Sequence, residues 1–273
     1  MANSENPGIS DQSLLRDVQY RDSSKLKARA NIHKCGRSPI GWFEWIAREA
    51  ALPEGAEVLD VGCGPGWLWA QDNGQFPSSS SVTLVDLSDG MVAEALERVR
   101  GLARYRGVAG RTADAVALPF ADGSFDAVLA CHMLYHVPDQ DRAIDEMVRV
   151  LRPGGKLVVT TNGDDDMIEM YRLAHAAFGG PDRNPSAIAV DLAKAEAMLR
   201  ARLDDVEAVI LRDELPVTDG EDIVGTLRSY PPGDGADDAQ IEALRSMIAA
   251  RMAEDGGVFR INKRTGLVRG RKR

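Results

Sequence analysis

The stretch Val58-Leu59-Asp60-Val61-Gly62-Cys63-Gly64-Pro65-Gly66 decides the fold of this chain. A short apolar run with an acidic residue near its end leads into a loop that has glycine at every second position. This pattern is typical of a buried parallel strand that passes into a helix beneath a ligand. Glycine permits positive φ and lets a ligand lie against bare backbone. The helix expected from Trp67 would then point its free N–H groups and its positive dipole end at that ligand.

The glycine spacing separates this loop from two common nucleotide-binding loops. Gly62-x-Gly64-x-Gly66 is one residue tighter than the dinucleotide fingerprint G-x-G-x-x-G. No Lys-Ser or Lys-Thr pair follows, which excludes a phosphate-binding P-loop. Taken alone, the stretch leaves open a tight strand–helix turn without a ligand.

Composition and cysteine usage narrow the class of protein. The 273 residues are 44% hydrophobic and 27% charged, an ordinary globular balance, and the net charge of −9 argues against general affinity for DNA or RNA. No apolar stretch approaches the ~20 residues that span a bilayer, and the N-terminus lacks the apolar core of a signal peptide. Scattered Cys35, Cys63 and Cys131 fit a reducing compartment and show no zinc spacing with the histidines. We therefore expect a cytoplasmic protein with no metal and no nucleic-acid or membrane partner.

Apolar segments that alternate with helical patterns predict an α/β fold with a doubly wound, mostly parallel sheet. The five expected core strands are residues 58–61, 82–86, 108–113, 126–131 and 157–161. Residues 206–211 and 267–271 add a sixth and a last strand, which makes the sheet seven-stranded, and Thr265-Gly266 looks like the turn before the last strand. The basic residues between Lys263 and Arg273 are expected to form a solvated tail.

Four stretches, taken in order, resemble the class I S-adenosylmethionine (SAM) methyltransferases. Residues 58–66 resemble motif I, and the strand that ends at Asp86 resembles motif II. Residues 113–115 with 118–126 are similar to the adenine-binding motif and its lead into the fourth strand, and residues 149–155 to the entry into the fifth. The resemblance is to the methyltransferase type 11 subgroup, which includes the ubiquinone/menaquinone methyltransferases and many natural-product methyltransferases. Residues 20–24 and 132–136 resemble a narrower bacterial small-molecule branch.

This resemblance implies a Rossmann-like class I fold in three parts. Residues 1–52 would form an N-terminal helical cap, with residues 1 to about 10 disordered. Residues 53–162 would form the SAM-binding core. Residues 163–273 would form the C-terminal part of the sheet together with helical insertions that act as a substrate lid.

The resemblance also implies SAM as cofactor, released as S-adenosyl-L-homocysteine, and suggests a role for several residues. Asp86 would accept hydrogen bonds from both ribose hydroxyls. Asp114, with the Ala115 backbone nearby, would accept from the adenine amino group, and Leu87 and Met91 would sandwich the adenine ring.

The remaining cofactor residues would hold the amino-acid tail and the sulfonium. The loop residues Gly62, Cys63, Gly64 and Gly66 would pack against the tail. Asp60 or the Cys131 carbonyl would take the ammonium group. Arg29 is the candidate for the tail carboxylate, with a plain surface arginine as an equal alternative. Tyr20 would close over the sulfonium by cation–π attraction, or would only anchor the cap.

His132 is the candidate catalytic residue. It follows the fourth strand at the substrate side of the sheet, where it could remove a proton from the acceptor. The alternative is a histidine that packs or hydrogen-bonds within the loop. As a base it would titrate near the ordinary pKa of ~6.5 unless burial moves that value. His136 is expected to be structural and to face the following helix, and Asp164-Asp165-Asp166 to form a solvated first helical turn.

These features predict a SAM-dependent methyltransferase that acts on a C, N or O nucleophile of a small molecule, such as a specialised metabolite. The protein would mainly position the acceptor and exclude water. Two alternatives stay open: a non-methylating protein of the same fold, either a SAM binder or a cyclase, and a protein or RNA methyltransferase, against which the net acidity counts. Substrate, acceptor atom and oligomeric state are left open.

Overall fold

A seven-stranded sheet in the order β3-β2-β1-β4-β5-β7-β6 organises the computed structural model, which describes residues 10–273. Its strands are β1 (Glu57–Val61), β2 (Ser81–Asp86), β3 (Gly107–Thr112), β4 (Phe125–Cys131), β5 (Leu151–Asn162), β6 (Asp204–Val217) and β7 (Phe259–Arg271). The first five are parallel, and β7 runs antiparallel to both β5 and β6. The predicted doubly wound, mostly parallel sheet is confirmed. The expectation for the first nine residues lies outside the described part of the chain.

Helices cover both faces of the sheet, which is why its central strands read as continuous apolar runs. On one face α6 (Gln140–Val150) and α9 (Leu192–Arg200) contribute to a core with Leu59 and Val61 of β1. On the other face α3 (Trp42–Ala50), α4 (Trp67–Ala70) and α5 (Asp89–Arg100) pack with Val58. The N-terminal α3 thus packs on the sheet rather than over its edge.

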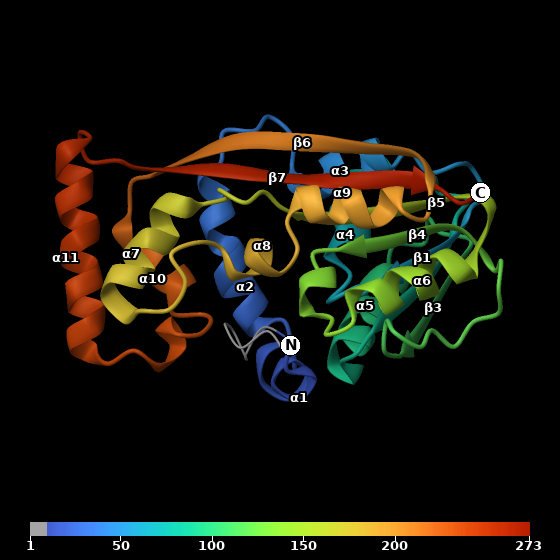
Figure 1. Ribbon diagram of the computed structural model, residues 1–273, viewed down its shortest axis with the longest axis horizontal. Coiled ribbons are helices and arrows are strands. Elements are labelled where there is room, and N and C mark those ends of the chain that lie inside the picture. The colour runs from blue at the N-terminus through green and yellow to red at the C-terminus, as the bar shows by residue number, and fades with distance from the viewer. Residues whose placement is uncertain (1–9) are drawn as a thin grey trace.

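A third core lies beyond the sheet and joins both ends of the chain. It gathers α7 (Ile168–Phe178), α10 (Gly220–Leu227), α11 (Asp238–Glu254) and the 3₁₀ helix η2 (Asn31–Cys35) around the outer halves of β6 and β7. Figure 1 shows β6 and β7 running from the sheet to α11 at the far end of the molecule. The helices α2 (Ser24–Ala30) and α8 (Pro185–Ala189) lie between two bodies, the sheet with its covering helices and the third core. None of the helices within residues 10–273 combines the length and apolar character needed to cross a membrane.

Two sequence-based expectations are wrong at the last strand, and the first concerns a predicted turn. Thr265-Gly266 is not a turn, because β7 continues through it, with Gly266 opposite Thr161 of β5 and Ile210 of β6. A Cβ atom on Gly266 would lie 2.4 Å from the Val209 carbonyl oxygen. Glycine is needed here for close approach of two backbones, and not for reversal of the chain.

The basic C-terminal residues do not form a solvated tail. Arg269 forms ion pairs with Glu49 and Glu207, at 3.4 and 2.8 Å. The Lys272 Nζ atom donates to the carbonyls of Arg149 and Leu151, at 3.1 and 2.8 Å. The sequence-based expectation is wrong because pairing of β7 between β5 and β6 supplies partners that lie far away along the chain.

The close approach at Gly266 generates a stability prediction. Gly266→Ala should lower the free energy of unfolding by about 1–3 kcal/mol, the range for overpacking, since the backbone of β6 cannot yield as a side chain can. Gly225→Ala is the matched control, because Gly225 lies in α10 with open space around a new Cβ atom. This control should be neutral or stabilising by up to about 1 kcal/mol. Urea denaturation measures both, and a Gly266→Ala protein as stable as the parent would contradict the placement of β7.

Candidate active site

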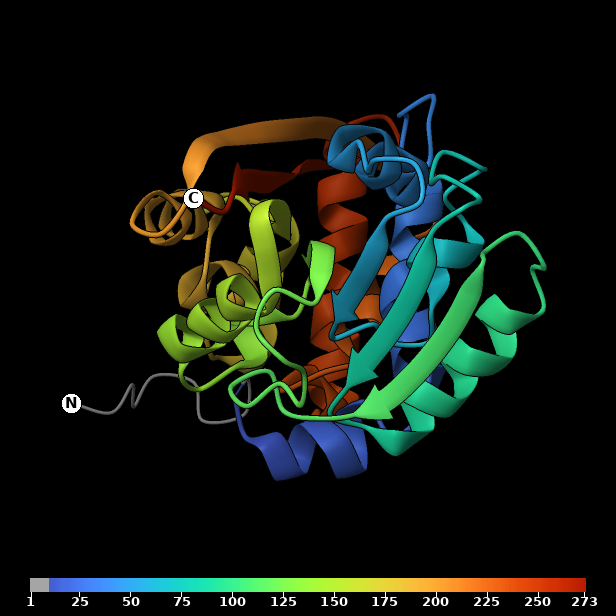
Figure 2. The ribbon, with the colours of Figure 1, turned by 90° about the vertical axis from the view of Figure 1, so that its right-hand side faces the viewer.

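A cavity of about 830 Å³ opens at the carboxyl ends of β1, β2 and β4, where doubly wound sheets bind ligands. This volume lies in the upper part of the ~300–1,000 Å³ range of small-molecule sites. Its floor is the loop after β1 and the ends of β2, β3 and β4. Its roof is α1 (Gln12–Leu14), the π-helical turn η1 (Leu15–Gln19) and α2. Figure 2 shows α1 at the edge of the sheet toward which the arrowheads of β2 and β3 point.

The glycine loop is held in place by the end of β2. The backbone N–H groups of Gly62 and Cys63 both donate to the Val85 carbonyl, at 2.7 and 2.9 Å. One residue further on, the Gly64 N–H donates to the Asp86 carboxylate, at 3.0 Å. These bonds fix the shape of the loop by groups that lie on the neighbouring strand.

The three glycines of the loop differ in what they make possible. Gly62, Gly64 and Gly66 have φ of +71°, +50° and +75°, which favours glycine at all three positions. A Cβ on Gly64 would meet nothing within 4 Å, so this backbone is bare toward the cavity. Gly66 is outside the cavity lining, and a Cβ there would lie 3.0 Å from the Ala95 Cα atom of α5. Its position predicts a packing role, which differs from the cofactor contact expected from the sequence.

Asp60 offers a buried oxygen that lacks a partner. Its Oδ2 atom accepts a hydrogen bond from the Trp69 indole N–H at 2.7 Å. Its Oδ1 atom is buried and has no hydrogen-bond partner among the described residues. Burial raises the pKa of this carboxyl to about 7. A cationic group in the cavity beside Oδ1 would satisfy the oxygen and favour the carboxylate, which fits the ammonium group of SAM.

The two carboxylates predicted to bind the nucleoside also hold protein groups. Asp86 Oδ1 accepts from the Ser88 N–H at 3.0 Å, so this carboxylate joins two loops, and burial raises its pKa. Asp114 accepts from the Gln12 side-chain amide at 2.9 Å. The roof helix α1 thus occupies an acceptor atom expected for adenine. Leu87, Met91 and Ala115 also line the cavity, and their contact with the adenine stays a prediction.

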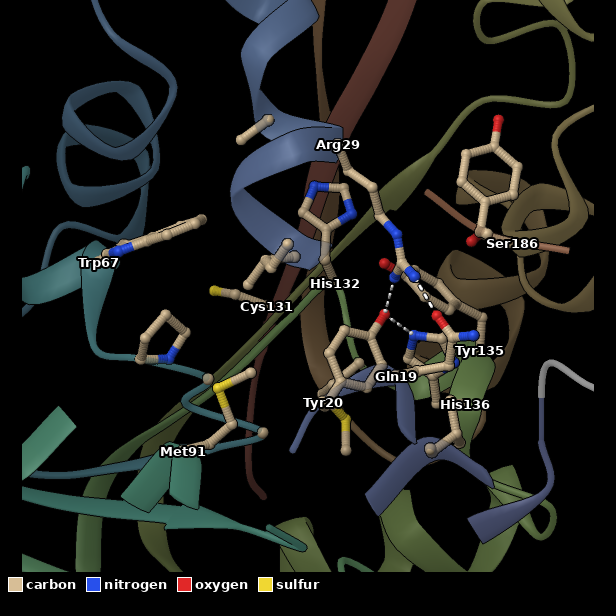
Figure 3. A pocket seen from close by; sticks show the side chains of 18 of the residues that line it. Gln19, Tyr20, Arg29, Trp67, Met91, Cys131, His132, Tyr135, His136 and Ser186 are labelled. Carbon is tan, nitrogen blue, oxygen red and sulfur yellow. Dashed lines mark hydrogen bonds between the residues drawn. The ribbon is translucent and has the colours of Figure 1, made fainter. Parts of the chain in front are cut away.

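A hydrogen-bonded network joins the roof of the cavity to the segment after β4 (Figure 3). Arg29 donates to the Tyr20 hydroxyl and the Ser229 carbonyl, each at 3.0 Å, and to the Gln19 side chain. The Tyr20 hydroxyl lies 2.8 Å from His136 Nε2. His136 therefore faces the cavity, and its expected orientation toward the following helix is wrong. The network anchors the roof with Tyr20, while the predicted carboxylate contact of Arg29 stays a prediction.

His132 lies in the middle of the cavity in an unusual backbone conformation. Its φ is +53°, and its N–H donates to the Thr160 carbonyl of β5 at 3.2 Å. Its ring centroid lies 5.3 Å from that of Trp42. Burial lowers the pKa of His132 to about 3, with smaller contributions from Lys263 and His136. The ring is thus neutral at neutral pH and a weak base, whereas the ordinary histidine value is ~6.5.

The thiols of the site are protonated. Burial raises the pKa of both Cys63 and Cys131 well above the ordinary value. Both line the cavity and are free of disulfides, as is Cys35. Among residues 10–273, no group of three or more His, Cys, Asp or Glu side chains could hold a metal ion.

The acidic triplet before α7 divides between surface and cavity. Asp164 and Asp165 each lie 3.0 Å from the Arg264 guanidinium and are largely exposed. Asp166 is buried and lines the cavity, where it accepts from the Arg264 N–H at 2.9 Å and the Asn184 amide at 3.0 Å. Burial raises the pKa of Asp166 to about 6. The expectation of a solvated turn is wrong for this residue, because the turn packs against β7.

Sequence reasoning missed part of the cavity lining, which comes from η2, α3, α4, α7, the segment after α10 and β7. These residues include His33, Trp42, Trp67, Tyr171, Tyr230 and Lys263. Most of them carry no local signal, since they meet only when distant segments pack together. Lys263 has one: it stands at an inward position of an alternating strand, between Ile261 and Thr265, where an apolar or small residue is the rule.

Comparison with known proteins identifies the domain that contains this site. Residues 59–159 match the family model described as "Methyltransferase domain". The chain is similar to the ubiquinone/menaquinone biosynthesis C-methyltransferase UbiE of Shewanella halifaxensis, with 37% identity over 43% of this chain and 47% of that protein. The chain spans about half the length of the curated relatives it matches.

Solved structures share the fold at low sequence identity. A methyltransferase-like protein from Bacillus halodurans matches with a TM-score of 0.59 and 20% identity, over 85% of this chain and 98% of that one. The [4+2]-cyclase SpnF matches with a TM-score of 0.53 and 19% identity, over 93% and 97%. Residues 59–159 thus match a methyltransferase domain, and the chain shares the class I fold of these structures. The comparisons support SAM as the cofactor.

The position of His132 in the cavity wall generates a titration prediction. Burial lowers the pKa of this ring to about 3. Between pH 6.5 and 3 the unfolded chain therefore binds more protons at this site than the folded protein, so acidification removes the stability that the neutral ring contributes. Ring ¹⁵N shifts should show the His132 imidazole neutral at pH 5, and the urea-unfolded chain should titrate near ~6.5. A protonation midpoint above pH 5 in the folded protein would contradict this burial.

Proposed function

We propose that this chain, through its SAM-dependent methyltransferase domain, transfers a methyl group to a C, N or O nucleophile of a small organic molecule. The observation that carries the proposal is the set of groups at the carboxyl ends of β1 and β2. A glycine loop bare toward the cavity, a buried Asp60 oxygen without a partner and the Asp86 carboxylate lie along one wall. They match the tail, the ammonium and the ribose of SAM in that order.

A small acceptor is supported by the way the cavity is closed. The roof helices cover one side, and α7, α8, α10 and β7 supply the opposite wall. The aromatic side chains of Trp42, Tyr135, Tyr171 and Tyr230 line the chamber. Such a chamber suits a partly apolar molecule that is enclosed, and is ill suited to a folded protein or an RNA strand.

The residues of the chain would bind, orient and exclude water. The bound cofactor supplies a methyl group on a sulfonium, a reactive centre that needs no metal at this site. Asp60 and Asp86 would fix the two ends of the cofactor, and the Tyr20–Arg29–His136 network would keep the roof closed. His132 would touch the acceptor as a neutral imidazole. With a pKa of about 3 it can accept a hydrogen bond, but it is a poor site for holding a proton.

A [4+2]-cyclase has the same fold, so a function other than methyl transfer is a second candidate. A non-methylating protein would bind SAM without consuming it. Conversion of SAM to S-adenosylhomocysteine by extracts supplemented with the purified protein separates the two. The cytoplasm stays the expected compartment, since all three cysteines are free thiols.

The role of Asp86 generates the binding prediction. Asp86→Ala should weaken S-adenosylhomocysteine binding by about 1.5–3 kcal/mol, the range for hydrogen bonds to a charged group, because two ribose hydroxyls lose their acceptor. Titration calorimetry measures this difference. Asp89→Ala is the control, since Asp89 lies in the first turn of α5 and outside the cavity lining. Equal affinities for parent and Asp86→Ala would place the ribose elsewhere, and no binding to a folded parent would end the proposal.

A further inference from the structure

Lys263 places a positive charge in the wall of the cavity that β7 and the lid helices form. It lies on β7 between Ile261 and Thr265, both buried, while Asn262 and Arg264 point to the other face. The ammonium group lies over the Trp42 ring, 5.3 Å from its centroid. Lys263 is half-buried, and burial lowers its pKa. A lysine that points inward from the β6–β7 pair is costly unless something pairs with it.

No carboxylate within residues 10–273 pairs with Lys263. The acidic groups that act on it are Asp166 and Asp213, and neither forms an ion pair with its ammonium. Both are already engaged. Asp166 accepts from the Arg264 N–H and the Asn184 amide. Asp213 Oδ1 accepts from the N–H groups of Arg37 and Glu214, at 3.0 and 2.8 Å.

The other polar neighbours of Lys263 are neutral. His33, on η2, and His132 both line this part of the cavity. His132 is half-buried and His33 is exposed. The charge of Lys263 opposes protonation of both rings. The wall thus combines one ammonium that has no carboxylate partner among the described residues with two imidazoles and the flat face of Trp42. An anionic oxygen would complete it, whereas a cationic or purely apolar ligand would leave the charge unpaired.

We propose that Lys263 binds the substrate as an anion, and that the substrate is a planar weak acid such as a phenol or an enol. This inference rests on the proposed function and names its substrate class. The O–H proton of the acid leaves to water on binding, and the ionised oxygen lies against the ammonium. The acceptor then reaches the cofactor already deprotonated. This removes the need for a protein base and agrees with the weak basicity of His132.

A chromophoric acid tests the proposal without knowledge of the natural substrate. The probe is 4-nitrophenol, whose ionised form has its own absorption band, added to protein saturated with S-adenosylhomocysteine. An opposite charge at close range lowers an acid's pKa by about 1–3 units, so the bound probe should ionise at least one unit below the free probe. The neutral isostere 4-nitroanisole should bind at least tenfold more weakly than the nitrophenolate.

Variants assign the effect to one side chain. Lys263→Met and Lys263→Gln should both abolish the shift, and Lys263→Arg should keep most of it. Lys194→Met is the matched control, because Lys194 is exposed on α9 and outside the cavity lining. Calorimetry with S-adenosylhomocysteine on each variant reports whether the fold and the cofactor site are intact.

The outcomes separate this inference from the proposed function. Cofactor binding together with an unshifted or unbound probe overturns the role of Lys263 and leaves the methyltransferase proposal standing. A shift that persists in both Lys263→Met and Lys263→Gln overturns it equally. Failure of the parent protein to bind S-adenosylhomocysteine overturns the proposed function itself.

Discussion

The hydrogen bonds between the end of β2 and the loop after β1 are the constraint on which the site depends. The Val85 carbonyl accepts two N–H groups of the loop, and Asp86 accepts a third while its other oxygen holds Ser88. These bonds hold the loop after β1 and the end of β2 together as one rigid unit, which we call the β1–β2 corner. In this corner the bare backbone of Gly64 faces the cavity, and Asp60 Oδ1 is without a partner among the described residues. Because the polar groups of the corner are fixed before any ligand arrives, little reorganisation is needed on binding.

The rest of the chain builds a chamber over this corner. The long β6–β7 pair carries a second hydrophobic body out from the sheet, and the N-terminal segment bridges the two bodies through η2. One wall of the chamber thus belongs to the sheet and the opposite wall to the lid helices and β7. The wall that belongs to the sheet would bind the cofactor, which is the same molecule in many enzymes. The opposite wall carries side chains, Lys263 among them, that would distinguish one acceptor from another.

The sequence could predict the parts of this structure that depend on residues close together in the chain. Parallel strands buried on both faces read as continuous apolar runs, and the loop at Gly62 has a spacing that few structures share. The parts that failed depend on distant pairing. Thr265-Gly266 looks like a turn until β6 is placed beside it, and only then does Gly266 become a point of close approach. Asp166 looks solvated until β7 lies between β5 and β6.

Burial explains the remaining difference between sequence and structure at the site. His132 was correctly expected to follow β4, but its chemistry depends on groups from α3 and β7 that no local pattern reveals. The same packing turns an ordinary titrating histidine into a neutral one. The three-part division of the chain stays a prediction, and α3 of its first part packs on the sheet.

A crystal structure of the protein with S-adenosylhomocysteine would show directly whether the ends of β1 and β2 hold the cofactor. We expect the ribose hydroxyls against the Asp86 carboxylate and the amino group within hydrogen-bond distance of Asp60 Oδ1. We also expect the adenine amino group at Asp114, with the Gln12 amide displaced from the oxygen that it now contacts. A ligand bound with its amino group away from Asp60, or with its ribose away from Asp86, would contradict the assignment of this corner as the cofactor site.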